Sequence, residues 1–226
     1  MNDIRGPAIL FDLDGTLVDS VYQHVLAWKE ALDSEGIPLS VWRIHRKIGM
    51  SGGLMTHILL RESGHSIDEA RGERLRRAHA AAFNRRSHEI RPLPGACELV
   101  AELTAARVPW AIATSGRMET AAHNLDALGV DPARVPVVTR DQVRHAKPDP
   151  DLFVTAAERL RVDIRDALVL GDSIWDMLAA QRARALGVGL LSGGYGEDEL
   201  ARAGAFRVYE DPADLLRHID EVAARS

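Results

Sequence analysis

The chain has 226 residues, 46% of them hydrophobic and 27% charged, which is typical of a globular protein with one large domain or two small ones. The net charge of -5 is unlike that of most nucleic-acid-binding proteins, so we expect no nucleic-acid partner. No apolar run approaches the ~18 residues of a membrane span, so we expect no association with a membrane. A single cysteine, Cys97, excludes an internal disulfide framework, which fits a cytoplasmic protein with Cys97 in its core.

Short apolar runs recur along the chain, and each is separated from the next by at least one helical pattern. This alternation predicts an α/β fold with a parallel sheet. The expected strands cover residues 8–11, 109–113, 135–138, 167–170 and 186–191.

Two of the helices between these strands have recognisable ends. Apolar residues follow the helical period from Met118 to Leu128, and Gly129 can adopt the left-handed conformation that ends many helices. Another helix is expected to open with Asp149 as its N-cap and Pro150 at its first helical position.

Residues 20–91 break the alternation, because they contain helical patterns and no convincing strand. An apolar face from Val21 to Leu32 predicts a helix that ends at Gly36, and the rigid turn at residues 92–95 marks the return to the α/β pattern. We therefore expect an inserted all-helical domain. The predicted boundaries assign residues 19–91 to this insertion and residues 1–18 and 92–226 to the core domain.

The charge of residues 20–91 differs from that of the remaining chain. This segment holds 12 Lys and Arg against 8 Asp and Glu, as well as six of the nine histidines. A solvated helical surface explains this pattern, because residues 71–77 have the spacing of an exposed helix face. Alternatively, the basic insertion steers an anionic substrate towards an acidic site.

Polar residues end three of the predicted strands. Asp12 and Asp14 follow the first strand, Thr114 follows the second, and Asp172 follows the strand at 167–170. The carboxyl ends of parallel strands meet at one edge of a sheet, and ligands bind outside that edge. The sequence therefore predicts one site built from three distant segments.

The acidic residues of this site are Asp12, Asp14, Asp172 and Asp176. Such a cluster cannot carry its full negative charge in a cleft unless a cation balances it, and otherwise a proton neutralises part of it. Hard carboxylate oxygens are the ligands that Mg²⁺ prefers, so we expect Mg²⁺ as the cofactor.

The remaining residues of the predicted site suit an anion. Thr114 and Ser115 supply hydroxyl groups, Gly116 supplies a backbone amide near a helix N-terminus, and Lys147 supplies an ammonium group. Together these donors describe a phosphate cradle.

Four motifs in this order resemble those of the haloacid dehalogenase-like hydrolase superfamily. The first is Asp12-Leu13-Asp14-Gly15-Thr16, and the others are Thr114-Ser115, Lys147-Pro148 and Gly171-Asp172-Ser173 with Asp176. The resemblance covers nearly the whole chain. It implies a Rossmann-like core, and it likens the helical insertion to the small mobile cap of subfamily I, in the branch of phosphoglycolate phosphatase and β-phosphoglucomutase.

The resemblance also implies roles for these residues. Asp12 would be the nucleophile of a phosphomonoesterase that forms an aspartyl phosphate, and Asp14 would be the general acid and base. Thr114 and Lys147 would bind the transferring phosphoryl group. The ligands of Mg²⁺ would be the Asp12 carboxylate, the Asp14 backbone carbonyl, Asp172 and Asp176.

Two other functions compete with a phosphatase. A β-phosphoglucomutase-like mutase is one, because His24 and Trp28 fall where that family has a histidine and a tryptophan, and His24 is then expected to contact substrate. Gly52, however, aligns with that family's substrate-binding arginine. The other alternative is a non-catalytic phosphate-binding protein, which would not need the catalytic residues.

The substrate is expected to be a small phosphorylated metabolite, with sugar phosphates and phosphoglycolate both open. Arg43, His45 and Lys47 are candidates for contacts with it, although solvent exposure also explains them. The oligomeric state is open, and a monomer is compatible with the sequence.

Overall fold

The computed structural model describes residues 7–66 and 68–223. Its core is one parallel sheet of six strands in the order β3-β2-β1-β4-β5-β6. The strands are β1 (Ala8–Phe11), β2 (Trp110–Ala113), β3 (Val137–Val138), β4 (Ala167–Gly171), β5 (Leu186–Leu190) and β6 (Ala205–Tyr209). The predicted α/β fold is therefore confirmed.

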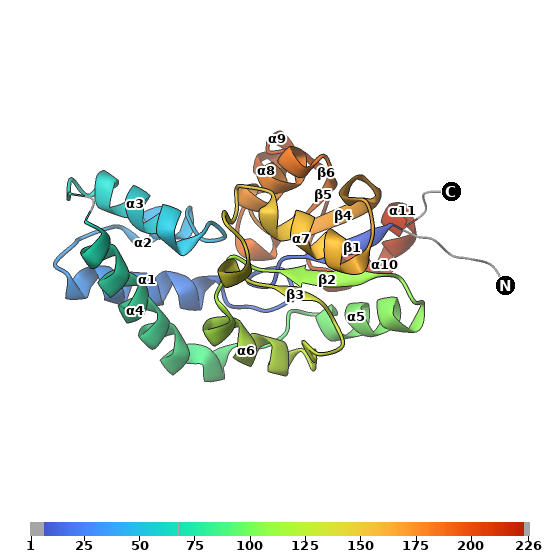
Figure 1. Cartoon of the computed structure of the whole chain (residues 1–226), viewed down its shortest axis with the longest axis horizontal. Coiled ribbons are helices and arrows are strands. Elements are labelled where there is room, and N and C mark those ends of the chain that lie inside the picture. The colour runs from blue at the N-terminus through green and yellow to red at the C-terminus, as the bar shows by residue number, and fades with distance from the viewer. Residues whose placement is uncertain (1–6, 67, 224–226) are drawn as a thin grey trace.

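Helices cover both faces of the sheet (Figure 1). One face packs on α5 (Ala96–Ala105), α6 (Met118–Ala127), α10 (Pro212–Arg217) and α11 (Ile219–Ala223). The other face packs on α7 (Asp151–Leu160) and α8 (Ile174–Ala183), and α9 (Glu197–Arg202) packs beside α8 and β6. Because both faces are covered, the central strands are continuous apolar runs, which is why they are readable in the sequence.

The insertion is helical, as predicted. It consists of α1 (Val21–Ser34), α2 (Val41–His45), α3 (Gly52–Glu62) and α4 (Glu69–Arg86), which lie together at one end of the molecule (Figure 1). Their apolar faces form a core of their own that includes Val25, Leu32, Ile44 and Leu59. We call these four helices and their connections the cap.

Two adjacent connections join the cap to the core domain. Val18 forms an isolated antiparallel bridge with Pro92, and the Asp19 amide donates to the Arg91 carbonyl over 2.9 Å. The chain therefore leaves the core and returns to it at one place. We propose this crossing as the boundary between residues 19–91 and the two core segments 1–18 and 92–226.

Three details differ from the sequence prediction. Strand β6 was not expected, because Phe206 and Arg207 are exposed at the sheet edge and leave no continuous apolar run. Helix α7 begins at Asp151 with Pro150 as its N-cap, because the amide of Asp149 donates to the Ala146 carbonyl and keeps Asp149 in the preceding turn.

The expectation that Cys97 belongs to the core is wrong. Helix α5 turns Ala96, Leu99, Val100 and Leu103 towards the sheet, and Cys97 lies on its exposed side. The ends of the other two helices agree with the prediction: Gly36 and Gly129 both have φ of +68° just after α1 and α6. None of the helices in residues 7–66 and 68–223 is long and apolar enough to cross a membrane.

Replacing Phe11 by alanine should lower the free energy of unfolding by about 3–5 kcal/mol, because a fully buried aromatic side chain leaves a cavity in the sheet core. Phe206→Ala is the matched control: its side chain is 53% exposed on β6, so the change should stay within about 0.5 kcal/mol. Urea unfolding followed by circular dichroism measures both. Equal losses would contradict the assignment of β1 to the centre of the core.

Candidate active site

The predicted site lies at the carboxyl edge of three adjacent strands. Phe11 at the end of β1 pairs with Ile112 of β2 on one side and with Leu170 of β4 on the other. Consequently the residues that follow these strands emerge side by side, and the Asp12 amide donates to the Leu170 carbonyl over 2.8 Å. The sheet thus brings Asp12, Thr114 and Asp172 together from positions far apart in the sequence.

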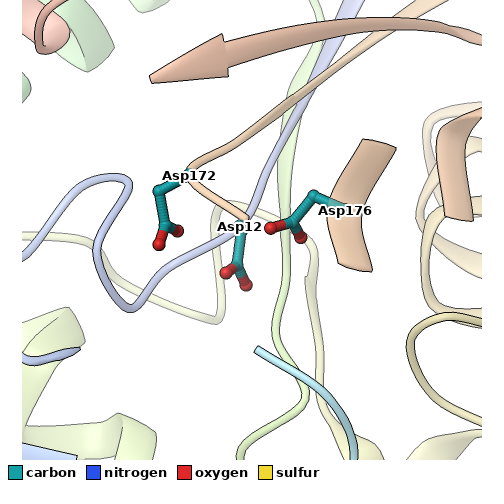
Figure 2. Close-up of side chains that lie close together, drawn as sticks. All are labelled: Asp12, Asp172 and Asp176. Atoms are coloured by element: carbon teal, nitrogen blue, oxygen red, sulfur yellow. The ribbon is translucent and has the colours of Figure 1, made fainter. Parts of the chain in front are cut away.

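Three carboxylates converge at this edge. Asp12, Asp172 and Asp176 each offer an oxygen within 4.8 Å of the other two, and all three side chains are buried. Figure 2 shows their carboxyl groups turned towards a common space from two strand ends and the first turn of α8. Asp176 is fixed in place because its Oδ2 accepts from the hydroxyl of Ser173 over 2.5 Å and from the amide of Ser173 over 3.1 Å.

A buried lysine balances part of this charge. The ammonium group of Lys147 forms an ion pair with Asp12, and it lies 2.8 Å from Oδ1 of Asp176. Burial alone would lower the pKa of Lys147, but the Asp12 and Asp176 carboxylates outweigh it and hold the pKa above its usual value. Lys147 therefore stays protonated.

One ammonium group does not compensate three buried carboxylates. Burial raises the pKa of Asp12 to about 7 against the opposing effect of Lys147. Burial and the Asp176 carboxylate raise the pKa of Asp172 well above its usual range. A divalent metal ion would supply the missing positive charge, and hard oxygen donors at this spacing fit such an ion.

Asp172 is held by close packing as well as by a hydrogen bond. The hydroxyl of Thr16 donates to its Oδ1 over 2.8 Å. A Cβ atom on Gly193 would lie 1.8 Å from its Oδ2, and one on Gly15 would lie 2.5 Å from the same oxygen. Glycine is therefore required on both sides of this carboxylate. Gly193 was not predicted, because no local pattern in the sequence relates it to Asp172.

Asp14 faces a different set of groups. Its Oδ1 accepts from the hydroxyl of Ser20 over 2.7 Å and from the amide of Asn124 over 2.9 Å. The Nε2 atom of His24 lies 3.3 Å from the same oxygen. Burial alone would raise the pKa of Asp14, but His24 and the hydrogen bond from Ser20 outweigh burial and hold the pKa below its usual value.

This environment favours the ionised form of Asp14, whereas a general acid needs a proton at the start of the reaction.

Asn124 is absent from the predicted site, although the sequence held a signal for it. It is a polar residue on the apolar face that Ala121 and Leu125 define on α6, and both of those residues are buried.

His24 contributes to an aromatic stack in the cap. The centroid of its ring lies 3.8 Å from that of Phe83 and 5.2 Å from that of His79, and the rings of Trp28 and His79 stack with their centroids 4.3 Å apart. Burial and the neighbouring His24 lower the pKa of His79 well below its usual value, so His79 is neutral and its Nε2 lies 3.0 Å from Nδ1 of His24. The stack fixes the ring of His24 against Asp14.

The predicted phosphate cradle is only partly assembled. Thr114, Ser115 and Gly116 line the same cavity as Asp12. The Gly116 amide donates to the hydroxyl of Thr114 over 3.0 Å, and Ser115 donates to the Gly49 carbonyl of the cap over 2.9 Å. Gly116 also precedes the N-cap of α6, which is Arg117. Ser115 in this structure joins the cap to the core.

The cavity has a volume of about 390 Å³ and lies between the core and the cap. This size accommodates one small ligand. Its lining includes His24, which the sequence analysis predicts to contact substrate, and Trp28, one turn further along the first cap helix.

Arg43, His45 and Lys47 do not belong to the lining. Arg43 lies over the exposed ring of Trp42, and Lys47 forms an ion pair with Glu62 over 2.9 Å. The Nε2 atom of His45 donates to the Gly193 carbonyl over 2.8 Å, which ties the cap to the core. Among the described residues of the cap, Arg76 of α4 is the arginine that lines the cavity.

Comparison with known proteins agrees with this geometry. A family model described as haloacid dehalogenase-like hydrolase matches residues 7–184. A crystal structure of a hydrolase from Pseudomonas syringae superposes with a TM-score of 0.95 at 59% sequence identity, covering 96% of this chain and 100% of that one.

Two characterised relatives are phosphatases. Validoxylamine A 7'-phosphate phosphatase of Streptomyces hygroscopicus subsp. limoneus is 34% identical over 183 residues, which are 80% of this chain and 84% of that protein. Hexitol phosphatase A of Escherichia coli (strain K12) is 34% identical over 172 residues, which are 75% of this chain and 76% of that protein.

Gly193→Ala should weaken Mg²⁺ binding by about tenfold or more, because the new methyl group displaces the carboxylate of Asp172. Gly196→Ala, in the same loop, is the control: the nearest atom to its added Cβ lies 3.6 Å away, and its φ of -77° is open to alanine. Calorimetric titration with Mg²⁺ compares the two variants. Similar affinities in both would contradict the packing role of Gly193.

Proposed function

Because the chain belongs to the haloacid dehalogenase-like hydrolase family, we propose that it hydrolyses the phosphate ester of a small metabolite with Asp12 as its nucleophile. One observation carries this proposal: Asp12 lines the cavity while its carboxylate pairs with the fully buried Lys147 beside two further buried carboxylates. The named phosphatases among its relatives support the same reaction class.

In the first step an oxygen of Asp12 attacks phosphorus, and the bond from phosphorus to the leaving alcohol oxygen breaks. Lys147 and Thr114 bind the transferring phosphoryl oxygens and stabilise their charge in the transition state. Asp14 gives a proton to the leaving oxygen. The charge of the incoming phosphate raises the pKa of Asp14, which offsets the effect of His24 and lets the carboxyl carry that proton.

In the second step water attacks the aspartyl phosphate, and Asp14 takes the proton of that water. Phosphate leaves and Asp12 is regenerated. Ser20, Asn124 and His24 hold the carboxylate of Asp14 in one orientation for both transfers. The environment that favours an ionised Asp14 thus suits this second step directly.

We propose Mg²⁺ as the metal ion, held by the carboxylates of Asp12, Asp172 and Asp176 and by the backbone carbonyl of Asp14. When bound, it neutralises the negative charge that would otherwise repel a phosphate from a carboxylate nucleophile. We propose that the protein is located in the cytoplasm. That it is a monomer remains a prediction.

The mutase alternative receives less support. Gly52 supplies no side chain where a β-phosphoglucomutase-like protein would have its substrate-binding arginine, and a Cβ atom there would lie 3.8 Å from Cδ of Arg76. Arg76 therefore occupies the adjoining space, but it is already paired with Glu69 and Glu73. Interconversion of hexose 1- and 6-phosphates would identify a mutase.

Asp12→Asn should abolish phosphate release from any phosphomonoester, because the amide cannot form the aspartyl phosphate. The same loss should follow removal of Mg²⁺ from the wild-type protein and should be reversed when Mg²⁺ is restored. Asp19→Asn is the control, since Asp19 is exposed, lies three residues after the motif ends at Thr16, and is absent from the cavity lining. Phosphate release in a colorimetric assay measures all three.

A substantial turnover by Asp12→Asn would exclude Asp12 as nucleophile. Phosphate binding without hydrolysis in the wild-type protein would instead support the non-catalytic alternative.

Asp14→Asn should slow hydrolysis of an alkyl phosphate by about 10²-fold or more, because its leaving oxygen needs a proton. With p-nitrophenyl phosphate the loss should be smaller, since p-nitrophenolate leaves without one. The rate constant for release of the leaving group, compared between the two substrates under single-turnover conditions, isolates the first step. Equal losses for both substrates would argue against Asp14 as the acid.

A further inference from the structure

The charged side chains that line the cavity outside the catalytic motifs balance one another. Three are arginines and three are carboxylates, and they come from both the cap and the core. The set is Glu69, Arg76, Arg117, Glu119, Arg140 and Asp141. A cavity built to hold a second anionic group would be expected to carry an excess of positive charge.

Helix α4 supplies the cap side of this wall. His79 contacts His24 beside Asp14, Arg76 lies one turn before it on the same helix face, and Glu69 lies two turns before Arg76. His79 therefore lies at the end of the cavity where the phosphate would bind. Arg76 and Glu69 lie further away, beside the part that would contain the alcohol portion of the substrate.

Arg76 is engaged by its neighbours on α4. Its Nη2 atom donates to Glu69 over 2.6 Å and to Glu73 over 2.8 Å, and its Nε atom donates to Glu73 over 3.0 Å. Only 19% of this side chain is exposed. A substrate carboxylate or phosphate would have to displace one of these carboxylates or lie close to it, at the cost of like-charge repulsion.

The arginines on the core side are also engaged. Arg117 lies 3.6 Å from Asp141, and Arg140 donates to the Val143 carbonyl over 2.8 Å. Glu119 adds a further negative charge to the lining. The core therefore presents donors and acceptors in comparable number rather than a cationic surface.

A wall with equal numbers of guanidinium and carboxylate groups matches hydroxyl groups, because each hydroxyl both donates and accepts a hydrogen bond. We propose that the cavity selects phosphomonoesters whose alcohol portion is uncharged and carries several hydroxyl groups, such as a hexitol monophosphate, and disfavours substrates with a second anionic group. This inference rests on the proposed phosphatase function and adds the class of its substrate.

The wild-type protein should hydrolyse a hexitol monophosphate with a kcat/KM about tenfold or more above those for phosphoglycolate and a hexose bisphosphate. Steady-state phosphate release with Mg²⁺ measures the three substrates, and p-nitrophenyl phosphate serves as the reference. A higher kcat/KM for phosphoglycolate or the bisphosphate would overturn the inference and leave the phosphatase intact. If Mg²⁺-dependent release fails for every ester, p-nitrophenyl phosphate included, the proposed function itself is wrong.

A double variant tests the role of the ion pairs directly. Glu69→Gln with Glu73→Gln removes the charges that engage Arg76, so the ratio of kcat/KM for phosphoglycolate to that for the hexitol monophosphate should rise about tenfold. Glu35→Gln is the control, because Glu35 pairs with Arg71 and Arg74 of the same helix outside the cavity. Its ratio should stay unchanged, and equal ratios in both variants would overturn the inference.

Discussion

The arrangement of the site depends on one electrostatic constraint: three carboxylates are buried within a few ångströms of one another, with a single ammonium group beside them. Desolvation penalises each ionised carboxylate, and several polar neighbours of the cluster reduce that penalty. Lys147 pairs with two of the carboxylates, Thr16 and Ser173 donate hydrogen bonds, and the remaining charge calls for a metal ion. The parallel pairing of β1 with β2 and β4 creates this constraint, because it places the residues that follow these strands at one edge of the sheet.

The sequence predicted those parts of the molecule that local patterns determine. The five buried strands are continuous apolar runs, and the aspartates follow directly where those runs end, so both strands and carboxylates could be found without a structure. Edge strand β6 could not be predicted, because it lacks a continuous apolar run. The packing of Gly193 against Asp172 could not be predicted either, because no pattern in the sequence relates these two residues. Asn124 and His79 lie between these cases, since each is a polar residue on an otherwise apolar helix face.

The charge of the cap illustrates a limit of composition. Its excess of arginine is compatible with a surface that attracts anions, yet Glu30 pairs with Arg85 and Arg86, and Glu35 pairs with Arg71 and Arg74. These four arginines are therefore held in surface ion pairs outside the cavity, although the excess of positive charge in the count is unchanged. The interpretation of a solvated helical surface is favoured by these contacts, and specificity must come from the few side chains that reach the cavity.

Gly193 makes two contacts that are usually considered separately. Its Cα packs against the carboxylate of Asp172, while its carbonyl accepts the hydrogen bond from His45 of the cap. Any shift of this residue would therefore affect both a proposed metal ligand and the contact that joins the two domains. Thermodynamic reciprocity then requires that, if occupancy of the metal site favours the joined arrangement of cap and core, that arrangement raises metal affinity by the same factor.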